Sequence, residues 1–186
     1  MKTQQSFMPG KVLIDKNTIS RRVDEIAQEI ANEYKGQDLV MLALLRGSFV
    51  FLADLIRSLF EHSMPLTVDF ISVSSYGDSV VSSGSAVIEH SHKLKLKGRQ
   101  VIIVDDILDT GTTLAAVKEH LLKEEPACIK TCVLLDKPAR RNLPVTADII
   151  GFTVENVFVV GYGLDYDDDY RYLPHIAELD GTKSND

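Results

Sequence analysis

Carboxylates, a glycine and three threonines follow an apolar run in the segment 101–114, which reads VIIVDDILDTGTTL. The β-branched run Val101–Val104 predicts a buried strand, and Leu114 starts a helical pattern. Backbone N–H groups at a helix N-terminus hold phosphate, and nearby carboxylates can bind sugar hydroxyls or Mg²⁺, or move a proton. The segment therefore predicts a phosphorylated-sugar site at the end of a strand. The candidate residues are Asp105, Asp106, Asp109, Thr110, Gly111, Thr112 and Thr113.

Three further segments also place polar residues after an apolar run. The first is LLRGS, with Arg46 and Gly47; the second is LLDKPAR, with Lys137. The third is FVVGYGLDYDDDYRYLP, which carries Phe158 and a series of acids. In open α/β sheets ligands bind beyond the carboxyl ends of the strands, so these segments are candidates for the same site.

The elements that must position these residues alternate along the chain. Helical spacing predicts a helix over residues 19–34, capped by Thr18 or Ser20 and ended by Gly36, and another over residues 49–60. Strands alternating with helices predict βαβ units and a mostly parallel sheet. Strands are expected at 39–45, 66–73, 86–89, 101–104, 129–135, 149–153 and 157–161.

Composition limits the classes of protein that fit. The net charge of −7, from 20 basic and 27 acidic residues, argues against nucleic-acid binding, which needs a basic face. The N-terminus lacks an apolar stretch of signal-peptide length, and no membrane span is expected, so the interpretation is a cytoplasmic protein. Cys128 and Cys132 are expected to be buried free thiols.

In order and spacing, these four segments resemble the hypoxanthine (hypoxanthine-guanine) phosphoribosyltransferases of the type I phosphoribosyltransferase family. The resemblance covers about residues 12–176. It implies an α/β fold with a mostly parallel sheet flanked by helices, a Rossmann-like core, and a small hood lobe. We expect a single domain over residues 1–186. Its core would span about 36–153, and its hood would combine the N-terminal segment with about 154–186.

The resemblance also implies a reaction in purine salvage. The 5-phosphoribosyl group of phosphoribosyl pyrophosphate would move to N9 of hypoxanthine or guanine, giving IMP or GMP and pyrophosphate, with Mg²⁺ as cofactor. Asp109 would be the general base beside N7 of the purine, and the residues 109–113 would hold the 5′-phosphate. Asp105 and Asp106 would meet the ribose hydroxyls, directly or through Mg²⁺. Residue 105 is usually Glu in the family, which reaches one methylene further.

Pyrophosphate would bind to Leu45, Arg46 and Gly47 around a non-proline cis peptide at Leu45–Arg46, and to Arg171. The family usually has Lys at position 46, and Arg keeps the charge. Asp165 would bind a second Mg²⁺ on the pyrophosphate side.

The purine would be held by residues from two segments. The Lys137 ammonium would select the 6-oxo group of the base, because an amino group there would place donor against donor. Phe158 would stack on the ring, and Val159 and Asp165 would meet the edge of the base. Ser75 and Tyr76 would begin a flexible loop that closes over the site.

Other functions remain open at this stage. Lys137 fits any 6-oxopurine, so a xanthine- or guanine-preferring phosphoribosyltransferase is an alternative. A non-catalytic, nucleotide-sensing regulator is a second, although it would need a basic face. The acids Asp165–Asp169 do not complete a calcium-loop motif, because Tyr170 stands where glycine is required. Small-molecule substrates are the expected partners, and the family usually forms homodimers or homotetramers.

Overall fold

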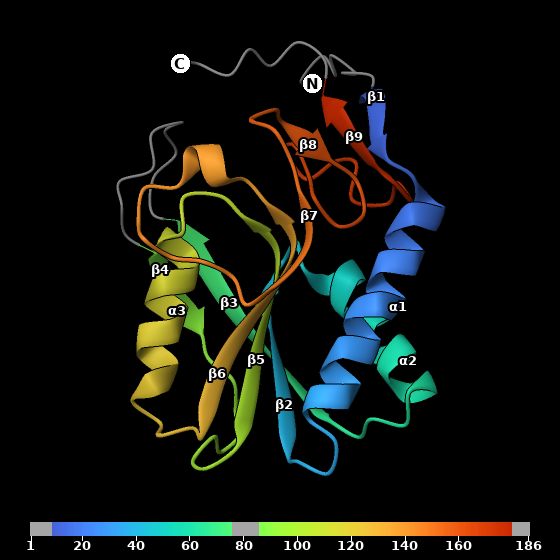
Figure 1. The fold of residues 1–186 in the computed structure, drawn as a ribbon. Coiled ribbons are helices and arrows are strands. Elements are labelled where there is room, and N and C mark those ends of the chain that lie inside the picture. Colours follow the sequence, from blue (N-terminus) through green and yellow to red (C-terminus); the bar gives the residue numbers. More distant parts are fainter. Residues whose placement is uncertain (1–8, 76–85, 180–186) are drawn as a thin grey trace.

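A computed structural model describes residues 9–75 and 86–179. These residues form a six-stranded sheet in the order β4-β3-β2-β5-β6-β7 and a three-stranded sheet in the order β1-β9-β8 (Figure 1). The strands are β1 (Pro9–Ile14), β2 (Leu39–Leu45), β3 (Thr67–Ser75), β4 (Ala86–His90), β5 (Gln100–Leu108), β6 (Cys128–Asp136), β7 (Ile149–Thr153), β8 (Val159–Val160) and β9 (Ile176–Leu179). The helices are α1 (Lys16–Glu33), α2 (Phe49–Glu61), α3 (Thr112–Leu122) and the short 3₁₀ helix η1 (Pro138–Arg140).

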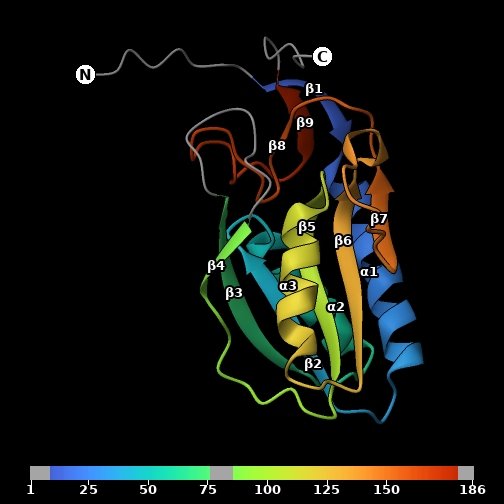
Figure 2. The same ribbon diagram turned by 90° about the vertical axis from the view of Figure 1, so that its left-hand side faces the viewer.

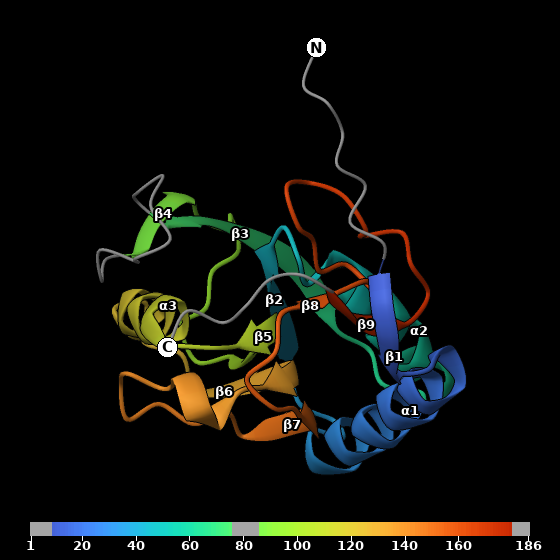
Figure 3. The ribbon, with the colours of Figure 1, turned by 90° about the horizontal axis from the view of Figure 1, so that it is seen from above.

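The large sheet is parallel except at one edge. The strands β3, β2, β5, β6 and β7 run parallel, and β4 pairs antiparallel with β3. The central strands β2 and β5 are apolar because both faces of the sheet are covered. Helices α1 and α2 lie on one face and α3 on the other, as the views from the side and from above show (Figures 2 and 3).

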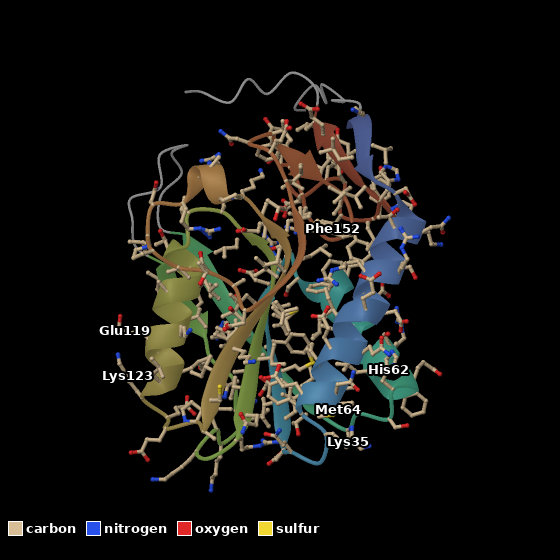
Figure 4. All side chains as sticks on the ribbon, viewed as in Figure 1. Lys35, His62, Met64, Glu119, Lys123 and Phe152 are labelled. Carbon is tan, nitrogen blue, oxygen red and sulfur yellow. The ribbon has the colours of Figure 1, made fainter. Side chains whose placement is uncertain are left out.

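Two apolar clusters fill the spaces between these layers. One joins α1 and α2 to the sheet and includes Ile26 and Phe51; the other joins α3 to the opposite face through Val117 and Leu121. Polar contacts add to the packing of α1 on α2. Ser58 Oγ donates to Asp24 Oδ1 over 2.7 Å. The ring of His62, labelled in Figure 4, lies 3.0 Å from the same oxygen.

The hood is the sheet of β1, β9 and β8, which joins the beginning of the chain to its end. Both pairings are antiparallel, and the sheet lies beyond one end of the parallel strands (Figure 1). The expected helix cap before α1 was wrong. Asp15 is the N-cap, and its carboxylate accepts hydrogen bonds from the N–H groups of Asn17 and Thr18 at 2.9 and 3.1 Å.

Burial also differs from expectation at one cysteine. Cys132 is buried, but Cys128, at the start of β6, is exposed. The two side chains fall on the same face of the strand, but Cys128 lies at its solvent end. Among the described residues, no helix is long and apolar enough to cross a membrane.

Two phenylalanines on α2 provide a matched test of the packing. Phe51 is fully buried, whereas Phe60 is 77% exposed. We expect Phe51→Ala to lower the free energy of unfolding by about 3–5 kcal/mol, because it leaves a cavity in the core. Phe60→Ala should change it by roughly 0.5 kcal/mol or less. Urea denaturation followed by circular dichroism measures both, and equal losses would contradict this packing.

Candidate active site

The paired acids lie within β5, whereas the sequence pattern predicts them at its end. The strand continues to Leu108 because it keeps pairing with β6, with Asp105 opposite Val133 and Ile107 opposite Leu135. The register with β6 passes over Asp106, and the carboxylates of Asp105 and Asp106 lie close enough for the charge of one to act on the other. The Asp106 N–H donates to Asp105 Oδ1 over 3.0 Å.

Both carboxylates are held in an environment that disfavours charge. Asp105 is only 9% exposed. Burial raises its pKa well above the usual range, and the nearby charge of Asp106 raises it further. Burial also raises the pKa of Asp106, against hydrogen bonds and the charge of Arg171, which act to lower it. A cation at this point would offset the cost of two buried neighbouring acids.

The loop from β5 to α3 has the shape expected of a phosphate cradle. Gly111 precedes the helix with φ of 87°, a left-handed conformation that favours glycine, and its carbonyl accepts the hydrogen bond from Ala115 N–H at 3.0 Å. The Thr110 hydroxyl donates to Thr112 Oγ1 over 3.2 Å, which fixes the turn. The first N–H groups of α3 therefore face a loop of small residues.

A second loop, between β2 and α2, approaches the same acids. The Leu45–Arg46 peptide bond is cis, as expected. Ser48 Oγ donates to the Leu44 carbonyl over 2.6 Å and closes the turn. Gly47 lies so close to Asp106 that a Cβ at this position would sit 1.7 Å from Asp106 Oδ2. The absence of a side chain at Gly47 therefore allows this loop to approach the acids.

These two loops enclose one cavity of about 350 Å³ at the carboxyl end of the parallel strands. It brings together three of the four candidate pyrophosphate residues, the paired acids and most of the candidate phosphate loop. The lining includes Leu45, Arg46, Gly47, Asp105, Asp106, Asp109, Thr110, Gly111, Thr113 and Arg140.

The hood contributes a charged loop beside this cavity. Arg171 Nη2 lies 2.7 Å from Asp165 Oδ1, and Arg171 Nη1 donates to the Gly163 carbonyl over 2.7 Å. Gly163 in turn touches the loop after β2, because a Cβ there would lie 2.3 Å from the Gly47 carbonyl oxygen. Arg171 is thus held against the candidate pyrophosphate loop, although it lines a different groove.

Lys137 follows β6 and is buried, with only 5% of its surface exposed. Its Nζ donates to the Val157 carbonyl over 2.5 Å. Burial lowers the pKa of its ammonium, and the charge of Asp109 acts in the opposite direction. The Lys137 ammonium is therefore held in one direction, toward the segment that precedes β8.

Of the three other candidate purine residues, Phe158 and Val159 follow Val157, whose carbonyl binds Lys137, whereas Asp165 pairs with Arg171. The half-exposed ring of Phe158 meets Tyr166 edge to face, with 5.5 Å between ring centroids. Val159 is buried in β8, opposite Glu178 of β9. Ser75 is the last residue of β3, and Tyr76 lies outside the described residues.

One charged residue of the cavity was missed from the sequence. Arg140 of η1 lines it, and its Nε lies 3.2 Å from Asp109 Oδ1. The signal available was the basic pair Arg140-Arg141 three residues after Lys137. The two arginines have different partners, because Arg141 makes a largely buried ion pair with Asp136.

The donors of the cavity fit Mg²⁺. Asp105 and Asp106 offer carboxylate oxygens, and this ion commonly takes one or two carboxylates, completing its shell with substrate phosphates and water. Within residues 9–75 and 86–179, no group of three or more His, Cys, Asp or Glu side chains is arranged to hold a metal. A bound ion would therefore depend on oxygens from the substrate.

Comparisons with known proteins agree with this geometry. A family model described as a phosphoribosyl transferase domain matches residues 13–167. The hypoxanthine-guanine phosphoribosyltransferase of Aquifex aeolicus is 43% identical over 167 residues, which cover 89% of this chain and 92% of that protein. The hypoxanthine phosphoribosyltransferase of Escherichia coli is 42% identical over 171 residues, or 91% and 94% of the two chains. The chain belongs to the hypoxanthine(-guanine) phosphoribosyltransferase family.

Solved structures of this family share the fold. The crystal structure of the hypoxanthine phosphoribosyltransferase from Staphylococcus aureus has a TM-score of 0.86 at 36% identity, covering 92% of this chain and 91% of that chain. The expected phosphoribosyltransferase fold, with its parallel sheet and hood, is therefore confirmed.

Proposed function

We propose that this phosphoribosyltransferase moves the 5-phosphoribosyl group of phosphoribosyl pyrophosphate to N9 of hypoxanthine, and also of guanine. The observation that supports this most is the single cavity lined by the cis-peptide loop, the paired acids and the β5–α3 loop. A pyrophosphate group, a ribose and a 5′-phosphate need these three kinds of site next to one another.

Each part of the donor has residues suited to it. The N–H groups and hydroxyls of the loop 109–113 bind the 5′-phosphate at the start of α3. Asp105 and Asp106 accept hydrogen bonds from the ribose hydroxyls. Arg46, Gly47 and Arg171 hold the pyrophosphate. Their positive charges and donors therefore already face the pyrophosphate when the bond from C1′ to its oxygen breaks and negative charge develops on it.

The acceptor base lies between Lys137 and Phe158. The Lys137 ammonium donates to the 6-oxo group, and Phe158 stacks on the ring beside Val159. N9 then forms the new bond to C1′ while Asp109 accepts the proton that N7 loses. A 6-amino group would meet Lys137 donor to donor, so adenine is disfavoured.

Mg²⁺ bound by Asp105 and Asp106, and a second ion by Asp165, would supply positive charge for the pyrophosphate. The ribose hydroxyls and the pyrophosphate oxygens would complete the coordination. Arg171, which pairs with Asp165, would keep that carboxylate in place.

The test of this function is identification of the products. Hypoxanthine, phosphoribosyl pyrophosphate and Mg²⁺ should give IMP and pyrophosphate in equal amounts, as measured by mass spectrometry and a coupled pyrophosphate assay. Excess EDTA should stop the reaction, and added Mg²⁺ should restore it. Tight binding of the donor without any product from a purine base would instead support the nucleotide-sensing regulator.

Lys137→Met tests recognition of the 6-oxo group. Methionine fills a similar volume but cannot donate, and a hydrogen bond from a charged group contributes about 1.5–3 kcal/mol. We expect the KM for hypoxanthine to rise roughly 10- to 100-fold, with the KM for phosphoribosyl pyrophosphate unchanged. Steady-state kinetics with each substrate varied in turn measures this. An unchanged KM for hypoxanthine would remove Lys137 from the purine site.

We further propose that the protein acts as a homodimer or homotetramer in the cytoplasm. A groove of about 1100 Å³ lies between α1, α2 and the hood. Phe49 and Tyr172 line it and are 45% and 80% exposed. Sedimentation velocity on the full chain tests the proposal, and a single species at the monomer mass would contradict it.

A further inference from the structure

The segment that carries Lys137 and Arg140 is fixed to the backbone on both sides of Asp109. The Lys137 N–H donates to the Leu108 carbonyl over 3.0 Å, and the Asn142 N–H donates to the Thr110 carbonyl over 3.1 Å. The residues before and after Asp109 are therefore both bound to this segment. Main-chain contacts therefore fix this segment relative to the backbone on either side of Asp109.

The turn that follows Lys137 places Arg140 at the cavity. The Arg140 N–H donates to the Lys137 carbonyl over 3.2 Å. Arg141 is paired with Asp136, and both side chains are about six-sevenths buried, at 15% and 13% exposed. With Arg141 held there, Arg140 is free to reach into the cavity that Asp109 lines.

The Asp109 carboxylate pairs with Arg140 and interacts electrostatically with Lys137. Arg140 Nε lies 3.2 Å from Asp109 Oδ1, and this oxygen is buried without a well-aligned hydrogen bond among the described residues. Burial lowers the pKa of the Lys137 ammonium. The charge of Asp109 acts to raise this pKa, and the charge of Arg140 acts to lower it. Lys137 Nζ is itself held by the Val157 carbonyl, so Arg140 is the cation that pairs directly with Asp109 among the described residues.

We propose that Arg140 is a positioning residue for the transfer reaction, holding the Asp109 carboxylate toward the purine and away from Lys137. The inference rests on the proposed function, in which Asp109 takes the proton from the base. It adds a residue that acts through Asp109 and touches neither the ribose nor the base. Its effect must therefore disappear when Asp109 can no longer accept a proton.

Arg140→Gln should lower kcat with hypoxanthine roughly 10- to 100-fold, the order expected when a reacting group is displaced by about an ångström. The KM for phosphoribosyl pyrophosphate should stay within about twofold, and Arg140→Lys should recover most of the loss. Lys97→Gln is the control, since it removes an exposed lysine–glutamate pair that lines neither the cavity nor the groove and should leave kcat unchanged.

A double-mutant cycle with Asp109→Asn decides the mechanism. If Arg140 acts through Asp109, the double variant should be as slow as Asp109→Asn alone. Additive losses would overturn the inference, and so would a higher KM for phosphoribosyl pyrophosphate with kcat intact, which would indicate direct phosphate binding. Failure of the proposed function is a different result, because the unaltered protein would then form no IMP. Full turnover in Asp109→Asn would remove only the role of Asp109 as the general base.

Discussion

Asp109→Asn should lower kcat for IMP formation by about 10²–10⁴-fold, the usual contribution of a positioned general base. Asparagine keeps the size of the side chain and its contacts with the loop, but it cannot accept the proton from N7. The affinity for phosphoribosyl pyrophosphate should stay close to that of the unaltered protein, because the backbone N–H groups of the loop are unchanged. Single-turnover kinetics and isothermal titration with the donor measure the two quantities.

The pairing of Asp109 with Arg140 provides an internal check on that result. An amide loses the ion pair but keeps an acceptor oxygen near Arg140 Nε, so the fold should melt within a few degrees of the original temperature. Full turnover in Asp109→Asn would contradict the assignment of the general base. A large loss of donor affinity would instead place Asp109 among the residues that bind the ribose hydroxyls.

Gly47→Ala should lower kcat/KM for phosphoribosyl pyrophosphate by about 100-fold or more. The new Cβ would lie 1.7 Å from Asp106 Oδ2 and 2.5 Å from Asp106 Cγ, so either the carboxylate or the cis-peptide loop must move. A displacement of about an ångström in a site can cost a factor of this size. Initial rates at varied donor concentration measure the effect.

Gly36→Ala is the matched control for this prediction. Gly36 has φ of 76°, and a Cβ there would meet no atom within 4 Å. Alanine at this position strains the backbone by about 1–2 kcal/mol, so it should lower the melting temperature without changing the kinetics. If Gly47→Ala retained donor kinetics within threefold, the close contact with Asp106 would have no role in catalysis.

The central strands could be predicted from the sequence because their signals are local. The run Leu39–Leu45 is apolar throughout and is followed by Arg46 and Gly47, and the structure has β2 at these bounds. The end of β5 was missed because Asp105 and Asp106 break the apolar pattern, whereas pairing with β6 continues the strand to Leu108. Hydropathy cannot reveal a strand that a neighbour extends.

The contacts between segments far apart in the chain could not be predicted from the residues. The strand β8 has two residues and is defined by its antiparallel partner β9, which follows after a long loop. The contact of Gly47 with Asp106 and that of Arg140 with Asp109 each join segments from different parts of the chain. The family resemblance implied roles for many residues of the four segments. It implied none for Arg140, the last residue of LLDKPAR.

The most direct measurement compares four acceptor bases, hypoxanthine, guanine, xanthine and adenine, in one spectrophotometric assay with Mg²⁺ and phosphoribosyl pyrophosphate. Hypoxanthine and guanine should be converted rapidly, and adenine should react at least about a hundredfold more slowly, because Lys137 in its proposed role donates to a 6-oxo group and disfavours a 6-amino group. Preference for xanthine over hypoxanthine would revise the substrate but keep the site. Turnover of adenine at a rate equal to that of hypoxanthine would contradict the account of the purine site.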